Sequence, residues 1–289
     1  MTPRVLIFTP TYGGLLRPEM LESVAAQRFD GELPHVISEE NPYPGRDMRN
    51  VLHQFNIGRG MALAGGYDAL LTVEHDMRLP ADAAALLWAV DAPVVYGVYM
   101  LRHGTNVLNA WRWEGWVNLG MSLSKHPEDL AQARAAQVVR VSGVGFGCTL
   151  IRREVLEAIP FRGTEGSGPD LAFAVDCLRS NWVAMAHFGV ACEHYHEGLW
   201  LTMDDDEAVT VEFVPSQSLT ANVYGESVPL VAGVGVGLPG LVAIELQRAG
   251  FGKIVRREER TETAVLPVGE ERKSGRAQER KSGGGKRVA

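Results

Sequence analysis

The stretch Asn56–Asp76, NIGRGMALAGGYDALLTVEHD, indicates the fold class of this chain. Its first half has the composition of a helix, a Gly-Gly pair predicts a turn, and Ala69–Val73 is an apolar strand. Two carboxylates, those of Glu74 and Asp76, follow directly at the carboxyl end of that strand. In an α/β sheet, ligands bind at this end of the strands. The stretch therefore predicts a helix, a turn and a strand that ends at a binding site.

Glu74 and Asp76 have the spacing of a pair of metal ligands. Side chains two residues apart on an extended chain point the same way. Two hard oxygen ligands on one side suit Mg²⁺ or Mn²⁺. The alternative is that both are solvated charges at the start of another helix, with Arg78-Leu79-Pro80 as its entry. The sequence leaves both interpretations open.

Apolar runs alternate with helical patterns over the first two hundred residues, which is typical of the α/β class. Short runs without polar residues, such as Val5–Phe8, are typical of parallel sheets. The other predicted strands are His35–Ser38, Val94–Met100, Val138–Val141, Val183–Ala186 and Val190–Cys192. The predicted helices are Pro18–Gln27, Met48–Leu63, Ala81–Val90, Arg153–Ala158 and Asp170–Ser180, and the aromatic-rich Asn106–Leu119 predicts a hairpin or an extended platform.

The composition shifts near residue 205, which predicts a domain over 1–205 and a small α+β module over 208–258. The module's expected elements are strands Val209–Val214 and Val228–Val236, a helix Pro239–Ala249 and a last strand Lys253–Val255. Residues 259–289 are polar, charged and rich in Gly and Ser, so we expect a disordered basic tail.

The bulk composition favours a soluble globular protein: of 289 residues, 46% are hydrophobic and 22% charged. The formal charge is −7, but the chain from Lys253 onward holds eleven Lys or Arg against six Glu, so the preceding part is near −12. Nucleic acid is therefore an improbable partner for the main domain. Three widely spaced cysteines argue for a reducing compartment and against a disulfide framework. With no segment long enough for a signal peptide or membrane span, we expect a cytoplasmic protein.

Four motifs occur in order over residues 3–200: Phe8-Thr-Pro-Thr-Tyr12, Asn56-x-x-Arg59, Glu74-x-Asp76, and Gly143-Val-Gly-Phe-Gly-Cys-Thr-Leu-Ile-Arg-Arg-Glu-Val-Leu with Pro169-Asp170-Leu-Ala-Phe173. In this order and spacing they resemble the family 2 type of glycosyltransferase, which has the GT-A nucleotide-sugar fold. No single motif is specific. The resemblance implies a Rossmann-like, mostly parallel sheet flanked by helices. It also implies transfer of a sugar from a nucleotide-diphosphate sugar to an acceptor hydroxyl.

If the resemblance holds, a metal ion, Mn²⁺ or Mg²⁺, offsets the charge of the leaving diphosphate. Asp76 would bind the ion directly, and Glu74 would hold the ribose or a metal-bound water. His194 is the best candidate for a third ligand because it follows a strand end, where similar enzymes place a metal-binding histidine. His196 is the second candidate.

The resemblance also implies a general base, because a sugar hydroxyl attacks poorly unless its proton is removed. Asp170 occupies the position of the family's base, which predicts an inverting enzyme. Gly168-Pro169 replaces the acidic residue that usually precedes this base. The alternative is that Asp170 is a plain helix N-cap, which aspartate favours.

Nucleotide recognition would fall to Thr9, Pro10, Thr11 and Tyr12, with Arg59 reaching the diphosphate or the base. The family's second-strand aspartate has no clear equivalent here. Three neighbouring residues are candidates for this role: Glu39, Glu40 and Asn41. The nucleoside of the donor, uridine or guanosine, is therefore left open. Arg59 is equally well explained as a surface residue of its helix. Trp111, Trp113 and Trp116 could stack on an acceptor sugar or a nucleobase, although buried packing is the commoner role of tryptophan.

Three other functions compete with sugar transfer. A nucleotidyltransferase would carry a basic, Gly-rich loop after the first strand, and Thr11-Tyr-Gly-Gly holds no basic residue until Arg17. A metal-dependent hydrolase could use His187, His194, His196 and Asp204–Asp206. A non-catalytic binding or structural protein is the third, and the module weakly resembles those of bacteriophage proteins, which implies a host cytoplasm. The acceptor (a glycan, a protein or a modified nucleobase) stays open, as does a homo-oligomer.

Overall fold

A computed structural model describes residues 2–12, 15–45, 47–101, 108–115, 120, 122–123, 127–143, 145–163, 168–196, 199–202, 210–223, 226–239, 243, 246–247 and 249–255. The chain divides into two units, Met1–Arg256 and Arg257–Ala289. The second unit, and with it the expected disordered tail 259–289, lies outside the described residues.

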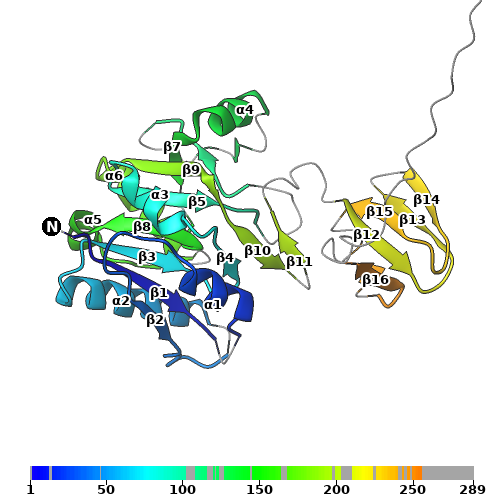
Figure 1. Ribbon diagram of the computed structural model, residues 1–289, viewed down its shortest axis with the longest axis horizontal. Helices are drawn as coiled ribbons and strands as arrows, with labels where there is room; N and C mark the ends of the chain where they lie inside the picture. Colours follow the sequence, from blue (N-terminus) through cyan, green and yellow to red (C-terminus); the bar gives the residue numbers. More distant parts are fainter. Residues whose placement is uncertain are drawn as a thin grey trace, which may run out of the picture. The chain divides into compact units, whose positions relative to one another are not determined.

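An eight-stranded sheet in the order β2-β1-β3-β8-β5-β9-β7-β6 forms the main body (Figure 1). Strands β7 and β8 run antiparallel to their neighbours, whereas β1, β2 and β3 pair in parallel, as do β5 and β9. The α/β class is therefore confirmed, with a sheet that is mixed. Its strands are β1 (Val5–Pro10), β2 (His35–Ser38), β3 (Ala69–Val73), β5 (Val94–Val98), β6 (Trp111–Arg112), β7 (Val138–Gly143), β8 (Cys148–Arg152) and β9 (Ala184–Ala191).

Helices cover both faces of this sheet, as the alternation of β1 shows. Leu6 and Phe8 belong to a hydrophobic cluster with side chains of α2, α4, α5 and α6, whereas Val5 and Ile7 belong to a second cluster with α1 and α3. A strand buried on both faces is continuously apolar, which explains why β1 and β3 have no polar alternation. The helices are α1 (Pro18–Ala25), α2 (Met48–Ala64), α3 (Ala83–Ala89), α4 (Pro127–Ala136), α5 (Arg153–Ala158) and α6 (Pro169–Arg179).

Helix α2 lies close to β1 because of one glycine. A Cβ on Gly58 would lie 2.6 Å from Cγ of Phe8, too near for any other residue without a shift of the ring. Asp47 begins the helix as its N-cap, accepting a hydrogen bond from Arg49 N at 2.9 Å. At the other end Gly66 has a φ of +67°, a conformation that favours glycine. Asp47 thus fixes where α2 starts, Gly58 lets the helix lie close to β1, and the candidate site lies at the start of the helix.

One expectation for the main body is corrected, and two of its elements were not expected. One strand, β9, replaces the two expected strands Val183–Ala186 and Val190–Cys192. Its register with β5 shifts between the partners of Gly97 and Val98, so a bulge accommodates the residues between the two apolar runs. The ten-residue helix α4 was not expected, because its polar sequence carries little helical periodicity. The two-residue strand β4 (Met77–Arg78) is too short to give a pattern. Within Asn106–Leu119, where a hairpin or platform was expected, the structure describes the strand β6, which pairs with β7.

The expected C-terminal module has a hydrophobic cluster of its own, formed by Phe213, Ala221, Leu230, Leu238 and Ala243. The expected strand Val228–Val236 is wrong. A turn with Gly233 at a φ of +74° separates two strands, because this conformation cannot continue a strand. The module's strands are β12 (Thr210–Pro215), β13 (Leu219–Val223), β14 (Glu226–Leu230), β15 (Val236–Pro239) and β16 (Gly252–Val255). Of the expected helix Pro239–Ala249, Pro239 ends β15, and Ala243, Leu246 and Gln247 are helical.

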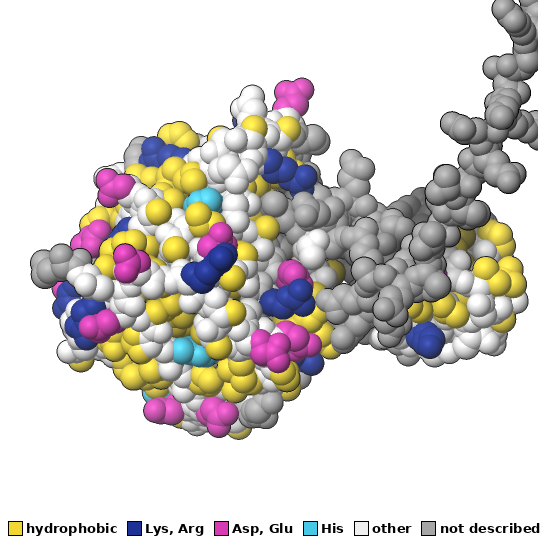
Figure 2. Space-filling view, viewed as in Figure 1, with side chains coloured by type: hydrophobic (Ala, Val, Ile, Leu, Met, Phe, Trp, Pro, Cys, Tyr) yellow, Lys and Arg dark blue, Asp and Glu magenta, His cyan; other side chains and the backbone are white. Residues whose placement is uncertain are grey.

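The surface of the main body carries mixed charge. On the face shown in Figure 2, Lys and Arg side chains lie scattered among Asp and Glu and form no continuous basic surface. Among the described residues, no helix is both long and apolar enough to cross a membrane.

Candidate functional site

A small antiparallel sheet brings the two predicted halves of the site together. It has the order β11-β10-β4, where β10 is Glu193–His196 and β11 is Leu199–Leu201. His194 lies opposite Met77 in the register of β10 and β4, and Tyr195 N donates to Asp76 O at 2.8 Å. Asp76 and His194, far apart in the sequence, are therefore held side by side by backbone pairing.

Glu74, Asp76 and His194 form a compact group. Each offers one ligand atom, and these atoms all lie within 4.8 Å of one another. His194 Nε2 lies 3.7 Å from Asp76 Oδ2, and both side chains are at most 5% exposed. Two carboxylates and an imidazole in this arrangement could hold a divalent metal ion.

The tautomer of His194 fits a metal ligand. Its Nδ1 lies 2.7 Å from Met100 O, and because a carbonyl only accepts, Nδ1 carries the proton. In the neutral form of the ring Nε2 then has a lone pair, and this buried atom has no hydrogen-bond partner among the described residues. Buried polar atoms seldom lack a hydrogen-bond partner. Histidines that bind metals commonly donate their other N–H to a backbone carbonyl, as His194 does.

We expect His194→Asn to weaken Mn²⁺ binding about 100-fold. The asparagine amide can still donate to Met100 O, but the variant lacks the Nε2 lone pair. His196→Asn is the matched control and should change the affinity less than about threefold, because His196 lies outside the group of three. Titration of the apo protein with Mn²⁺, followed by electron paramagnetic resonance, measures both. Equal losses in the two variants would refute the assignment of His194 over His196.

A cavity of about 830 Å³ opens beside this group. Its walls come from the first turns of α2 and α6, from the loops after β3 and β5, and from β6. Glu74 and His194 share it with Asp170, so two members of the group of three and the predicted base line one space, whereas Asp76 is not among its described lining residues. The described lining residues are Met48, Val51, Phe55, Glu74, Tyr99, Leu101, Asn109, Trp111, Gly120, Gly143, Phe146, Gly168, Pro169, Asp170, Leu171, Ala174 and His194.

Asp170 lies in the first turn of α6, after the N-cap residue Gly168 and Pro169. It is therefore not the N-cap, the alternative that the sequence left open. Its carboxylate accepts from Leu171 N at 2.9 Å. Burial in the cavity wall raises the pKa of Asp170 above the ordinary value for aspartate, while hydrogen bonds from the backbone N–H groups of Leu171 and of Asp170 itself oppose the rise.

Gly168 makes room for this carboxylate. A Cβ at position 168 would lie 2.5 Å from Asp170 Oδ1. The backbone of Gly168, with φ −66° and ψ 166°, is open to any residue. The glycine is thus required by the side chain of Asp170 and not by the backbone.

Sequence reasoning missed Tyr99, a buried residue directly after β5. Its ring meets that of His194 edge-on at 5.3 Å, and its hydroxyl accepts from Gly147 N at 3.3 Å. Burial raises the pKa of Tyr99 well above that of free tyrosine, and the carboxylates of Glu74 and Asp170 add to the rise. The phenol therefore stays protonated between the two acids. Its place at the carboxyl end of a strand was the available signal.

The three tryptophans of the expected platform separate. Trp111 lines the cavity, and its Nε1 donates to Asn109 Oδ1 at 2.9 Å. Trp113 lies elsewhere, with the guanidinium of Arg140 stacked 4.0 Å from its ring centre. Trp116 lies outside the described residues. A stacking role in the cavity is thus a proposal for Trp111.

The segment Thr9–Tyr12, at the carboxyl end of β1, is fixed by side chains around it. Thr9 Oγ1 lies 2.9 Å from His35 Nε2. Thr11 is buried, with its N–H donating to Gln54 Oε1 at 3.0 Å while Gln54 Nε2 donates back to Thr11 O at 3.1 Å. Pro10 is the last residue of β1. The segment is held by these hydrogen bonds, but it lies outside the described lining of the cavity.

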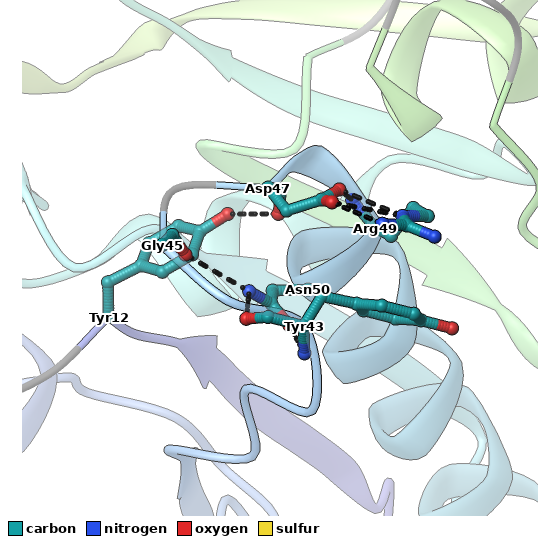
Figure 3. A network of polar contacts seen from close by, with 6 residues as sticks. All are labelled: Tyr12, Tyr43, Gly45, Asp47, Arg49 and Asn50. Carbon is teal, nitrogen blue, oxygen red and sulfur yellow. Dashed lines mark hydrogen bonds and ion pairs between the residues drawn. The ribbon is translucent and has the colours of Figure 1, made fainter.

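Tyr12 is tied to the loop that leads into α2 (Figure 3). Its hydroxyl donates to Asp47 O at 3.1 Å, and Asn50 bonds to both the N–H and the carbonyl of Tyr43 at 2.8 Å. Arg49 pairs with the carboxylate of Asp47 and lies over the ring of Tyr43 at 4.2 Å. The loop is therefore ordered by its own polar contacts next to the end of β1.

Three further predicted site residues lie outside the described lining of the cavity. Arg59 Nε donates to Leu156 O at 2.7 Å and so joins α2 to α5. Glu40 lies 3.5 Å from His53 on the surface. His196 pairs with Leu199 between β10 and β11. Of the hydrolase set, Asp204–Asp206 lie outside the described residues.

Comparison with solved structures shows a distant likeness in fold. No protein-family model matches the chain, and no curated protein matches it. The crystal structure of A197 from STIV is similar over 70% of this chain and 91% of that chain, with a TM-score of 0.49 and 21% sequence identity.

The chemistry of the site follows from its own residues. A group of two acids and a histidine could bind a divalent ion, and the ion would attract an anionic ligand. A carboxylate with a raised pKa can accept a proton near neutral pH. The same cavity is lined by residues of the candidate metal group, by the carboxylate of Asp170 and by apolar side chains.

Proposed function

We propose that this protein is a metal-dependent glycosyltransferase of the GT-A type. It moves a sugar from a nucleotide-diphosphate sugar to an acceptor hydroxyl. The observation that carries the proposal is that Glu74 and His194 of the metal group and the carboxylate of Asp170 line the same cavity. A transferase needs a cation at the leaving group and a base at the acceptor, both within reach of one sugar carbon.

Asp76 and His194 would hold the ion, Mn²⁺ or Mg²⁺, with Glu74 beside them and His196 as the second candidate. An imidazole ligand is more usual for transition metals than for Mg²⁺, which favours Mn²⁺. The ion supplies positive charge where the leaving diphosphate becomes more negative.

Asp170 would act as the general base of an inverting reaction. The acceptor oxygen bonds to the anomeric carbon, the bond from that carbon to the diphosphate oxygen breaks, and the acceptor proton passes to the Asp170 carboxylate. A base whose pKa is closer to the working pH accepts the proton more effectively. Its raised pKa supports this role.

Nucleotide contacts by Thr9, Pro10, Thr11, Tyr12, Glu40 and Arg59 stay part of the proposal. Thr9–Tyr12 has support from its position at the carboxyl end of β1. Arg59 has less support for such a role, because its side chain would have to give up the hydrogen bond to Leu156 O. We also propose residues 1–205 as the transferase domain, 208–258 as a separate module and 259–289 as a tail.

A thermal-shift panel tests the function. We expect one of UDP-, GDP-, CMP- or dTDP-sugars to raise the melting temperature in the presence of Mn²⁺ and not without it, since a ligand that binds only the folded state stabilises it. Sugar release in the same mixture separates a transferase from a non-catalytic binding protein. Stabilisation by nucleoside triphosphates alone would favour a nucleotidyltransferase, and no metal-dependent shift by any donor would overturn the proposal.

A further inference from the structure

We propose that the acceptor is a neutral molecule with an apolar group beside its reacting hydroxyl, such as an alkyl or aryl glycoside. The proposal rests on the transferase function above and specifies its acceptor class. It excludes a phosphorylated acceptor and a plain, fully hydrated sugar.

The wall of the cavity next to Asp170 is apolar. Phe55 and Phe146 are buried at its base, with ring centres 4.8 Å apart. Met48 and Leu171, in the first turns of α2 and α6, also line the cavity and are 54% and 42% exposed. Exposed apolar side chains beside buried apolar ones mark a surface that gains free energy when a ligand covers it.

Leu171 directly follows Asp170 in the sequence, and both line the cavity. An acceptor whose hydroxyl reaches the Asp170 carboxylate would therefore place its neighbouring atoms near Leu171. Water-covered hydroxyl groups would gain little there, whereas an alkyl or aryl group would be buried. The apolar group is thus expected close to the reacting hydroxyl.

The charges of the described lining disfavour, while no metal ion is bound, an acceptor that is itself an anion. Its described lining holds the carboxylates of Glu74 and Asp170 and, within that set, no lysine or arginine. A phosphate on the acceptor would be repelled by both acids at low effective dielectric. A neutral acceptor avoids this cost. The volume of about 830 Å³ lies in the upper range of ligand cavities, with room for two joined groups.

Isothermal titration calorimetry on the full chain, without metal or donor, tests the acceptor class with three compounds below their micelle concentrations: methyl β-glucoside, hexyl β-glucoside and hexyl phosphate. We expect hexyl glucoside to bind at least tenfold more tightly than methyl glucoside, since each buried methylene favours binding. Hexyl phosphate should bind at least tenfold more weakly than hexyl glucoside.

Two exposed residues allow a matched control. The double variant Met48→Ser with Leu171→Ser should lose at least fivefold of the hexyl advantage and leave methyl glucoside unchanged. Met61→Ser alters an exposed methionine of the same helix outside the described lining of the cavity, and should retain the advantage. An equal loss in Met61→Ser, equal binding of the two glucosides or no binding of hexyl glucoside would overturn the proposal.

The outcome separates this inference from the proposed function. Loss of the chain-length effect, with metal-dependent stabilisation by a nucleotide sugar intact, would overturn the acceptor class alone. Loss of that stabilisation, with the chain-length effect intact, would overturn the transferase and leave an apolar binding site. Hexyl phosphate binding as tightly as hexyl glucoside would show that the two acids do not select against an anion.

Discussion

Asp76→Ala will abolish sugar transfer, with a loss of at least roughly 10³-fold in kcat/KM. The carboxylate lies 3.7 Å from His194 Nε2 and within the group that could hold the ion. Without it the site has one acid fewer, and the leaving diphosphate has no cation to offset its charge. Steady-state kinetics with Mn²⁺ and the donor identified by the thermal-shift panel measures the loss.

The fold of Asp76→Ala should persist, with a melting temperature within a few degrees of the wild type. Asp76 is a buried acid, so its removal also removes the cost of burying a carboxylate. Asp30→Ala, at an exposed acid outside the described lining of the cavity, should change neither transfer nor stability. If transfer survives in Asp76→Ala, the metal assignment is wrong. A collapse of the melting temperature would instead make Asp76 a structural residue.

Local sequence signals were enough for the parts of the site that lie within one element. Ala69–Val73 is predicted from its apolar run, and the structure gives β3 the same bounds. Glu74 and Asp76 could be predicted as site residues because the end of this strand can be recognised in the sequence. His194 was placed after a strand end, which is where β10 lies. The pairing of β10 with β4 could not be predicted, since a two-residue strand has no period.

Contacts between elements were beyond the sequence. Arg59 lies on a helix face that could meet the nucleotide or another element, and only the position of α5 shows that it bonds to Leu156 O. Tyr99 and Asn109 bear no motif, and they reach the cavity because β5 and the chain before β6 end beside it. The break between β14 and β15 depends on one glycine conformation inside an apolar run. Propensity alone cannot distinguish these cases.

Asp170→Asn will lose transfer by roughly 10²–10⁴-fold while it retains binding of the nucleotide sugar. The amide cannot accept the acceptor's proton, but it keeps the size of the side chain, and its oxygen can still accept from Leu171 N. The metal group is unchanged. Transfer assays and calorimetric titration of the donor with Mn²⁺ measure the two effects separately.

The pH dependence gives a second reading of the same carboxylate. Asp170 must be ionised to act as a base, and its pKa is raised by burial. The acid limb of kcat/KM should therefore lie above the ordinary aspartate pKa of about 4. Asp170→Asn should lack this limb in its residual rate. An acid limb at the ordinary value would contradict the assigned base.

Stability should change in the opposite sense to activity. Because the folded state binds the proton of Asp170 more tightly than the unfolded chain does, this group lowers stability as pH rises through the interval from its ordinary pKa to its raised one. Asparagine lacks that penalty. The melting temperature of Asp170→Asn should equal or exceed that of the wild type at neutral pH, and the difference should vanish toward roughly pH 4.

Two further variants separate a base from a structural residue. Gly168→Ala places a Cβ 2.5 Å from Asp170 Oδ1 and should displace the carboxylate, lowering transfer with little effect on stability. Asp176→Asn, on the same helix, breaks the 2.6 Å ion pair with Arg162 and should lower stability with little effect on transfer. If Asp170→Asn instead lost donor binding and stability together, as a helix-terminal residue would, the carboxylate would hold α6 in place and another group would have to take the proton.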